Sequence, residues 1–439
     1  MKPATITPAG RTVLDNGLAI LVRPHPRSRS VAVHLVLQAG AAFDPEGGAG
    51  LAAFVAMLLD RGAGDLTARE IAAGFDRLGA TFHAGARRDT IDVECRCLPG
   101  HLEEILGRLR LLVGSPTFPG DEVERARGLI LTSLAERAQD TAAMAEEALH
   151  ETLFPAGHPY HAPRIGRRDS IGAIGQADLR RFHARSFRPR GAVLALAGAI
   201  RTGEATAMAA REFAGWKDDT GGASSLPGSR SVPSGRPVFA DPPRPDRLIA
   251  VRRRIEGKTQ SDIAIGFPGL RRDDPGLVPA MVFNCVLGEF GIGGRLGREV
   301  REKAGLAYYA FSRFAPGLGP GPLMVRSGVT VEKVDRAVAL IDRTLALVAR
   351  RGFRPAEVND AKTSLAASVP REMETNVAAA ATLAHAEFYG QGIDFPDRLP
   401  GLIGAVTHRQ VEETAGRYLT PGHQVQVIAG PDTPAKGRS

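Results

Sequence analysis

The sequence repeats itself once at long range, and this duplication constrains the fold more than any other feature. The segment Phe118–Val123 (FPGDEV) precedes a long alanine-rich helical pattern, and Phe353–Val358 (FRPAEV) precedes another in the second half of the chain. A second matching pair of segments ends at Gly198 and at Gly430, with nearly the same offset between its members. This period is that of a whole domain and is too long for a solenoid repeat.

A segment rich in Gly, Ser and Pro separates the two halves. Such a composition cannot bury enough surface to order itself and is typical of a linker. The sequence therefore predicts a first domain at 1–217, a linker at 218–237 and a second, homologous domain at 238–439.

Each half has the same order of expected elements: strands, a helix, further strands, then helices and a final strand. In the first half, Leu18–Val22 and Val31–Leu37 are rich in β-branched and aliphatic residues, and the apolar spacing from Leu51 to Leu59 is that of an amphipathic helix. Strands and helices mixed without strict alternation predict an α+β fold, with helices packed on a mixed, largely antiparallel sheet in each domain.

Composition excludes several classes of protein. The chain has 56 Lys and Arg against 48 Asp and Glu, a net charge of +8, but its arginines are scattered, and five Tyr and one Trp give few stacking platforms for bases. The longest basic run, Arg252–Arg254, is expected on a solvated strand face, so no nucleic acid is expected as a partner. No window approaches 18–20 uncharged apolar residues and Met1–Gly10 does not resemble a secretory signal, so we expect a cytoplasmic protein without a membrane partner.

The first expected helix has an unusual open face. Leu51, Phe54, Val55, Leu58 and Leu59 form its core-facing stripe, which leaves Ala53, Ala56 and Met57 on the other side. Two alanines and a methionine supply neither a strong metal ligand nor a base.

This helix carries a family resemblance. The run Gly50–Leu59 (GLAAFVAMLL) resembles the zinc helix of the pitrilysin/insulinase metallopeptidases, whose inverted motif is His-x-x-Glu-His. The resemblance implies a pitrilysin/LuxS-like metallohydrolase fold. It places the two His ligands at Ala53 and Met57, the general base at Ala56 and the third ligand near Ser133, so every zinc-related position has lost its donor.

The second half keeps a different pair of residues. Arg295–Lys303 is expected to form a helix ended by Gly305, and Leu306–Phe314 a strand, so that Arg301 and Tyr308 flank a reversal of the chain. In the resembling enzymes an Arg and a Tyr at this spacing bind the substrate's backbone carbonyl. The alternative is that Arg301 caps a helix and Tyr308 packs.

A glycine-rich segment lies just before this helix. Gly288, Gly291, Gly293 and Gly294 are expected in a loop, and because no Lys-Ser/Thr pair follows, nucleotide binding is not expected. The resemblance implies a substrate-guiding loop, and a plain flexible turn is the alternative.

Histidines outside the lost motif offer few further ligands. His150, His158 and His161 are close in sequence, but loop packing is the expected role, since Phe154 stands where a His-x-x-x-His pattern would be completed. His34 is expected to be a hydrogen-bonded polar residue of an edge strand.

Loss of the zinc donors with an intact Arg/Tyr pair predicts half of a divided active site. The chain resembles the zinc-less subunit of a heterodimeric peptidase. The resemblance implies that it holds no cofactor itself, that its homologous partner carries zinc, and that the substrate is an unfolded peptide added to a sheet edge. In catalytic relatives the zinc-bearing domain supplies that edge, so the corresponding strand here, Thr81–Arg87, is expected to be vestigial. Two alternatives stay open, a catalytically inert scaffold subunit derived from a peptidase and an autonomous peptidase with an unrecognised site.

Overall fold

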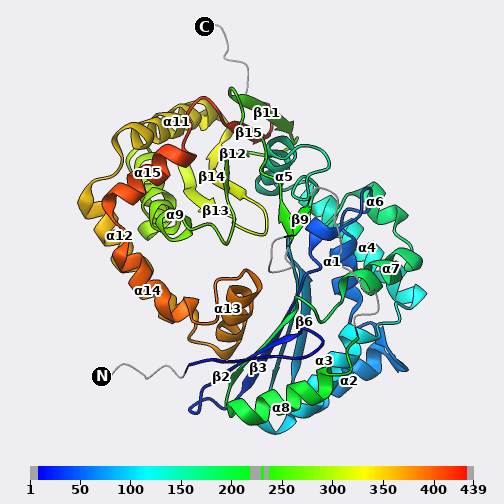
Figure 1. The fold of residues 1–439 in the computed structure, drawn as a ribbon. Coiled ribbons are helices and arrows are strands. Elements are labelled where there is room, and N and C mark those ends of the chain that lie inside the picture. The colour runs from blue at the N-terminus through cyan, green and yellow to red at the C-terminus, as the bar shows by residue number, and fades with distance from the viewer. Residues whose placement is uncertain (1–7, 218–228, 232–236, 433–439) are drawn as a thin grey trace. The chain divides into compact units, whose positions relative to one another are not determined.

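Two β-sheets, one from each half of the sequence, organise the chain (Figure 1). The computed structural model describes residues 8–217, 229–231 and 237–432. The first sheet has the strand order β1-β2-β8-β3-β7-β6 and the second has the order β11-β15-β12-β14-β13. In both sheets one parallel pair, β2/β8 or β11/β15, is followed by three antiparallel pairings. The second sheet therefore repeats five strands of the first, and the expected α+β fold is confirmed.

The strands of the first sheet are β1 (Gly10–Val13), β2 (Ala19–Pro24), β3 (Val31–Leu37), β6 (Thr81–Ala86), β7 (Ile91–Cys97) and β8 (Val193–Gly198). Those of the second are β11 (Ile249–Arg254), β12 (Gln260–Leu270), β13 (Ala307–Phe314), β14 (Gly321–Thr330) and β15 (Val425–Gly430). Short pairs are formed by β4 (Gly62–Ala63) with β5 (Leu66–Thr67) and by β9 (Ser229–Ser231) with β10 (Pro237–Phe239).

The helices of the first half are α1 (Leu51–Leu58), α2 (Ala68–Arg77), α3 (Leu102–Gly114), α4 (Gly120–Arg137), α5 (Thr141–Leu153), α6 (Arg168–Ala173), α7 (Gln176–Ser186) and α8 (Thr202–Phe213). Those of the second are α9 (Leu277–Asn284), α10 (Phe290–Leu296), α11 (Val334–Arg351), α12 (Pro355–Glu372), α13 (Asn376–Phe388), α14 (Phe395–Ala405) and α15 (His408–Tyr418).

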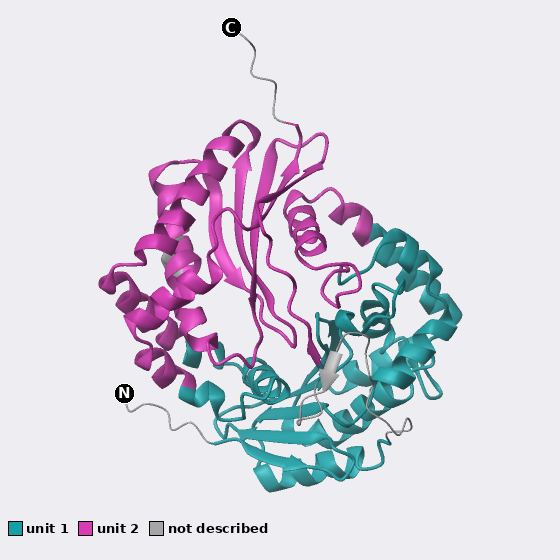
Figure 2. Cartoon of the chain, turned by 45° about the horizontal axis from the view of Figure 1, so that its top comes forward, with its two compact units in different colours: residues 1–132, 164–237, 369–398 teal, residues 133–163, 238–368, 399–439 magenta. Residues whose placement is uncertain are grey.

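The two compact units do not coincide with the two halves of the sequence (Figure 2). Unit 1 comprises residues 1–132, 164–237 and 369–398, and unit 2 comprises 133–163, 238–368 and 399–439. The predicted domains 1–217 and 238–439 therefore need correction. The predicted linker 218–237 lies largely outside the described residues, which omit 218–228 and 232–236.

The correction has a physical cause, because each sheet is covered by a helix from the other half. In unit 1, α13 packs on β3 and β8, while α3 and α8 lie on the opposite side of the sheet (Figure 1). In unit 2, α5 packs on β12 and β15. The two helices are equally long and start at equivalent positions of the repeat, Thr141 and Asn376, so they are repeat partners that have exchanged sheets.

The basic run is placed as expected. Arg252, Arg253 and Arg254 lie on β11, which is an edge strand, and all three are exposed. None of the described strands pairs with the outer edge of β11, so this strand closes the sheet on that side.

The expectation that no stretch approaches the length and apolarity of a membrane span is wrong. The continuous helical stretch 277–303 is long and apolar enough to cross a membrane by length and composition, although 60% of its most apolar window is buried within the fold. Burial of that extent is typical of a core helix, so the stretch is weak evidence for a membrane span.

Polar contacts fasten α5 to the second sheet. The Arg326 guanidinium on β14 donates from Nη1 to Glu146 Oε2 (2.9 Å) and from Nη2 to the Ala142 carbonyl (2.8 Å). The Thr141 hydroxyl donates to Asp262 Oδ2 on β12 (2.7 Å). Arg326 is largely buried, so its hydrogen bonds are shielded from competing water.

We expect Arg326→Ala to lower the free energy of unfolding by about 1.5–3 kcal/mol, the range for hydrogen bonds to a charged group. Urea unfolding would measure the change. The control is Arg253→Ala, which removes an exposed pair with Glu151 and should cost less than about 1 kcal/mol. Equal losses in the two variants would contradict a special role for Arg326.

Candidate functional site

The α1 helix has a firmly held start. Asp44 accepts hydrogen bonds from the Gly50 N–H at Oδ2 (2.7 Å) and from the Ala52 N–H at Oδ1 (2.8 Å), satisfying donors that a helix N-terminus leaves unpaired. Burial raises the pKa of Asp44 to about 7. The two hydrogen bonds favour the ionised form and oppose this rise, but burial has the larger effect. The start of the helix is therefore held by hydrogen bonds within the chain.

The face of α1 that carries zinc ligands in the resembling peptidases has no strong donor. Ala53 is half-buried and Met57 is 38% exposed, as expected for an open face, whereas Ala56, one helical turn from Ala53, is buried. Ser133, on α4, is exposed. Methyl, thioether and hydroxyl groups do not replace the two imidazoles and the carboxylate that bind zinc in such sites.

The reversal between Arg301 and Tyr308 forms as the sequence predicts. The helical stretch ends at Lys303, and Gly305 has a φ of +60°, a left-handed conformation that glycine adopts without a steric penalty. The Gly305 N–H donates to the Arg301 carbonyl (3.1 Å), and β13 begins at Ala307. The last helical turn and β13 are in contact.

Tyr308 departs from the expected strand alternation. A register shift between Ala307 and Tyr309 places it in a β-bulge, where the side chain is 59% exposed, whereas Ala310 and Ser312 of the same expected face are buried. Bulges of this kind re-aim a side chain. Arg301, which donates from Nη2 to Glu302 Oε1 (3.2 Å), is about one quarter exposed.

The glycine-rich segment is helical, so the predicted loop needs correction. A π-helical turn at Cys285–Glu289 leads directly into α10. A Cβ on Gly288 would lie 2.0 Å from the Ser312 backbone nitrogen, and one on Gly293 would lie 2.3 Å from the Ala310 carbonyl oxygen. Gly294 has a φ of +57° and is equally crowded, by the Val286 carbonyl. Gly288 and Gly293 therefore let the helical stretch approach β13 closely, whereas Gly294 permits a close approach within the stretch itself. The surroundings of Gly291 lie outside the described side chains.

We expect Gly288→Ala to destabilise the protein by about 1–3 kcal/mol, because the methyl group would force the helix away from β13. The matched control is Gly128→Ala on α4, where the added Cβ would meet nothing within 4 Å and better helix propensity should stabilise by roughly 1 kcal/mol. Thermal unfolding of both variants would test the contrast, and a neutral Gly288→Ala would contradict it.

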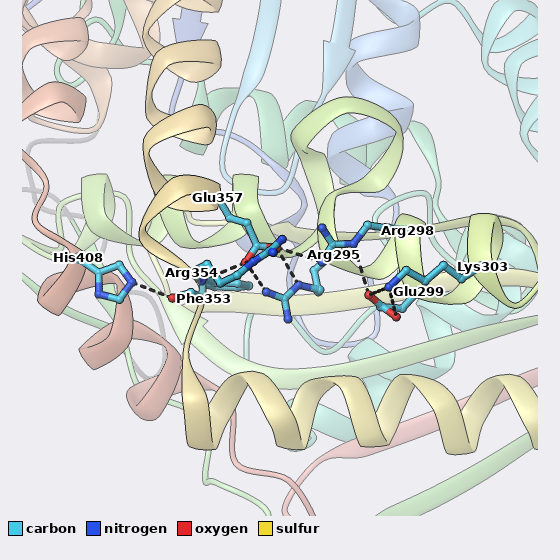
Figure 3. A network of polar contacts seen from close by, with 8 residues as sticks. All are labelled: Arg295, Arg298, Glu299, Lys303, Phe353, Arg354, Glu357 and His408. Atoms are coloured by element: carbon cyan, nitrogen blue, oxygen red, sulfur yellow. Dashed lines mark hydrogen bonds and ion pairs between the residues drawn. The ribbon is translucent and has the colours of Figure 1, made fainter.

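A basic pocket in unit 2 was not predicted. It has a volume of about 530 Å³ and is lined by Arg295, Arg298, Lys303, Leu347, Arg351, Gly352, Phe353 and Arg354. Glu357 accepts hydrogen bonds from Arg295 and Arg298, two of the residues that line the pocket (Figure 3). Burial alone would raise the pKa of Glu357. Hydrogen bonds from Arg295 and from the Arg354 N–H outweigh burial and lower this pKa to about 2.

This shift gives a pH-dependent contribution to stability. The unfolded chain protonates a Glu near pH 4.3, before the folded protein does, so the contribution of Glu357 is complete above about pH 5 and is lost towards pH 2. We expect Glu357→Gln to be less stable than the parent by about 2–3 kcal/mol near neutral pH, with the difference shrinking as the solution is acidified. Denaturant unfolding at several pH values would measure this. Glu302→Gln, in an exposed ion pair, is the control, and a pH-independent difference for Glu357→Gln would contradict the assignment.

The histidines divide into two groups. His158 Nε2 bonds the Ala240 carbonyl (3.0 Å) and His161 Nδ1 bonds the Phe154 carbonyl (2.8 Å), which is the expected loop packing. The interpretation of His34 is wrong, because β3 is an interior strand and both ring nitrogens of this buried side chain are without a hydrogen-bond partner in the described part of the chain.

Taken together, the fold and the altered helix define a protein derived from a zinc metallopeptidase. Residues 19–164 match the family model for "Insulinase (Peptidase family M16)", and residues 173–365 match the model for "Peptidase M16 inactive domain". The chain belongs to the insulinase family, peptidase family M16.

Similar proteins span almost the same length. A Mycobacterium leprae protein named "Uncharacterized zinc protease" is 26% identical over 95% of this chain and 91% of its own length. A Helicobacter pylori protein named "Non-peptidase homolog YmxG" is 22% identical over 87% of this chain and 84% of its own. The crystal structure of a peptidase M16 inactive domain from Pseudomonas fluorescens superposes with a TM-score of 0.86 at 26% identity, covering 96% of this chain and 98% of that one.

Proposed function

We propose that this chain is the subunit without catalytic zinc of a heterodimeric insulinase-family peptidase, and that its partner is a homologous chain carrying the His-x-x-Glu-His helix. One observation carries the proposal: Tyr308, a large aromatic side chain, is 59% exposed in a bulge directly after the helix that bears Arg301. A tyrosine kept only for packing would be buried. The loss of donors at Ala53, Ala56, Met57 and Ser133 supports the need for zinc from another molecule.

The chemistry follows from the two retained side chains. The partner's zinc would supply an activated water for attack on a peptide carbonyl. Arg301 and Tyr308 would donate hydrogen bonds to the substrate's backbone carbonyl and stabilise the negative charge that develops on its oxygen. They would also hold the peptide in register for cleavage.

The substrate proposed is an unfolded peptide. Among the described strands, β6 at the end of the first sheet pairs with β7 alone, and β13 is the corresponding edge strand of the second sheet. An extended peptide adds to such an edge through backbone hydrogen bonds, which explains affinity without a deep pocket.

The name of the Helicobacter pylori relative, "Non-peptidase homolog YmxG", favours a second candidate function, that of an inert scaffold subunit derived from a peptidase. This function needs neither Arg301 nor Tyr308 for activity of the complex. The two proposals therefore differ in one measurable quantity.

We expect Arg301→Ala and Tyr308→Phe to reduce peptide turnover by the reconstituted pair roughly 10²–10³-fold, the usual loss for one oxyanion donor, while partner binding is unchanged. Mixing the purified chain with its zinc-bearing homologue and a quenched peptide gives the readout. Arg313→Ala, an exposed arginine on the same strand, is the control. Unchanged turnover in both test variants would favour the scaffold, and chelator-sensitive cleavage by this chain alone would overturn both proposals.

A further inference from the structure

Three side chains in unit 1 gather their ligand atoms around one point. His34 on β3 is only 4% exposed, Asp92 on β7 is buried, and His385 on α13 is mostly buried. Asp92 Oδ2 lies 3.0 Å from His385 Nε2 and 3.5 Å from His34 Nε2, and the three ligand atoms all lie within 4.8 Å of one another.

Contacts among the three side chains account for only part of this arrangement. Both ring nitrogens of His34 and Nε2 of His385 lack a hydrogen-bond partner in the described parts of the chain, although two of them approach Asp92 closely. A buried polar group without a partner costs about 1–3 kcal/mol, so the cluster requires another explanation.

The spacing fits coordination of a metal ion. Ligands about 2.0–2.1 Å from a tetrahedral zinc ion are separated from each other by about 3.4 Å. The two distances to Asp92, 3.0 and 3.5 Å, lie on either side of this value. A shared ion would use the lone pairs that the imidazoles now leave unpaired.

Asp92 is prepared to act as a charged ligand. The Thr90 hydroxyl donates to Oδ1 (2.6 Å) and orients the carboxylate, and the Arg87 Nε donates to Oδ2 (2.5 Å). Arg87 is largely exposed, so its side chain has room to turn into solvent when an ion takes its place.

The second repeat shows that the architecture does not require this cluster. His34 pairs with Ala195 in the first sheet, and in the second sheet Ala264 pairs with Val427, the residue that corresponds to Ala195. By the same register Asp92 corresponds to Met324, while His385 corresponds to His150 on α5. Unit 2 therefore forms the same sheet and helix with an alanine and a methionine in place of two of the three ligands.

We propose that His34, Asp92 and His385 bind one divalent transition-metal ion of the zinc class and thereby clamp α13 to the first sheet. Two imidazoles with one carboxylate suit zinc and its neighbours rather than magnesium, which prefers oxygen ligands. The burial of the three residues assigns the ion a structural role. It would join two strands near the start of the chain to a helix near its end.

The test uses the full-length protein after removal of bound metal with a chelator. Titration with zinc, followed by calorimetry and elemental analysis, should give one ion per chain, raise the thermal midpoint and show little response to magnesium. Binding should weaken below about pH 6, because the imidazoles must be neutral to coordinate. The assay needs neither partner nor peptide, so its result is independent of the proposed function.

Variants locate the ion. His34→Ala and His385→Gln should abolish stoichiometric binding, whereas His83→Ala, an exposed histidine on β6, should leave it intact. Thr90→Val, which keeps the side-chain shape but not the hydrogen bond to Asp92, should weaken binding roughly 10–100-fold, and it decides the question if His34→Ala fails to fold. A folded parent protein that binds no zinc near neutral pH, or binding that survives both His385→Gln and Thr90→Val, would overturn the proposal.

Discussion

The packing of a helix from one half of the sequence onto the sheet of the other half is the constraint on which both units depend. The β3 and β8 strands are buried throughout, and α13 covers one face of them, while α5 does the same for β12 and β15. Neither half therefore completes a unit by itself. Because these contacts join residues that are distant in the chain, they cost loop-closure entropy before they stabilise the fold, and they favour slow, cooperative folding.

The residues that hold α1 in place are different from those at its zinc-ligand positions. Its apolar stripe and the Asp44 cap suffice to hold it in place, so the ligands of a zinc site can be replaced without loss of the fold. In unit 2 the positions of Arg301 and Tyr308 depend on equally local devices, the left-handed Gly305 and a β-bulge. A chain of this family can thus lose the zinc donors of α1 and still hold Arg301 and Tyr308 in place.

Local patterns predicted much of this structure. The helix from Leu51, the chain reversal at Gly305 and the following strand all depend on interactions within a few residues, which periodicity and turn chemistry express directly. The burial of Ala56 could not be predicted, because a stripe pattern shows only one packed face, whereas neighbouring elements cover more than one side of α1. The glycine-rich segment was predicted to be a loop, but it is helical. Gly288 and Gly293 are needed because β13 passes close to them, and the sequence around these glycines does not show that contact.

Residue patterns alone establish that the chain is a duplicated α+β protein, that its zinc helix lacks donors, and that Arg301 and Tyr308 flank a turn. Three features emerge only when the chain is folded: which half supplies the helix over each sheet, the meeting of Arg295 and Glu357 at a basic pocket, and the approach of His385 to His34 on an interior strand. The reason is range: propensity, capping and periodicity act along the chain over one or two turns, whereas sheet order and helix exchange bring together residues that no local pattern relates.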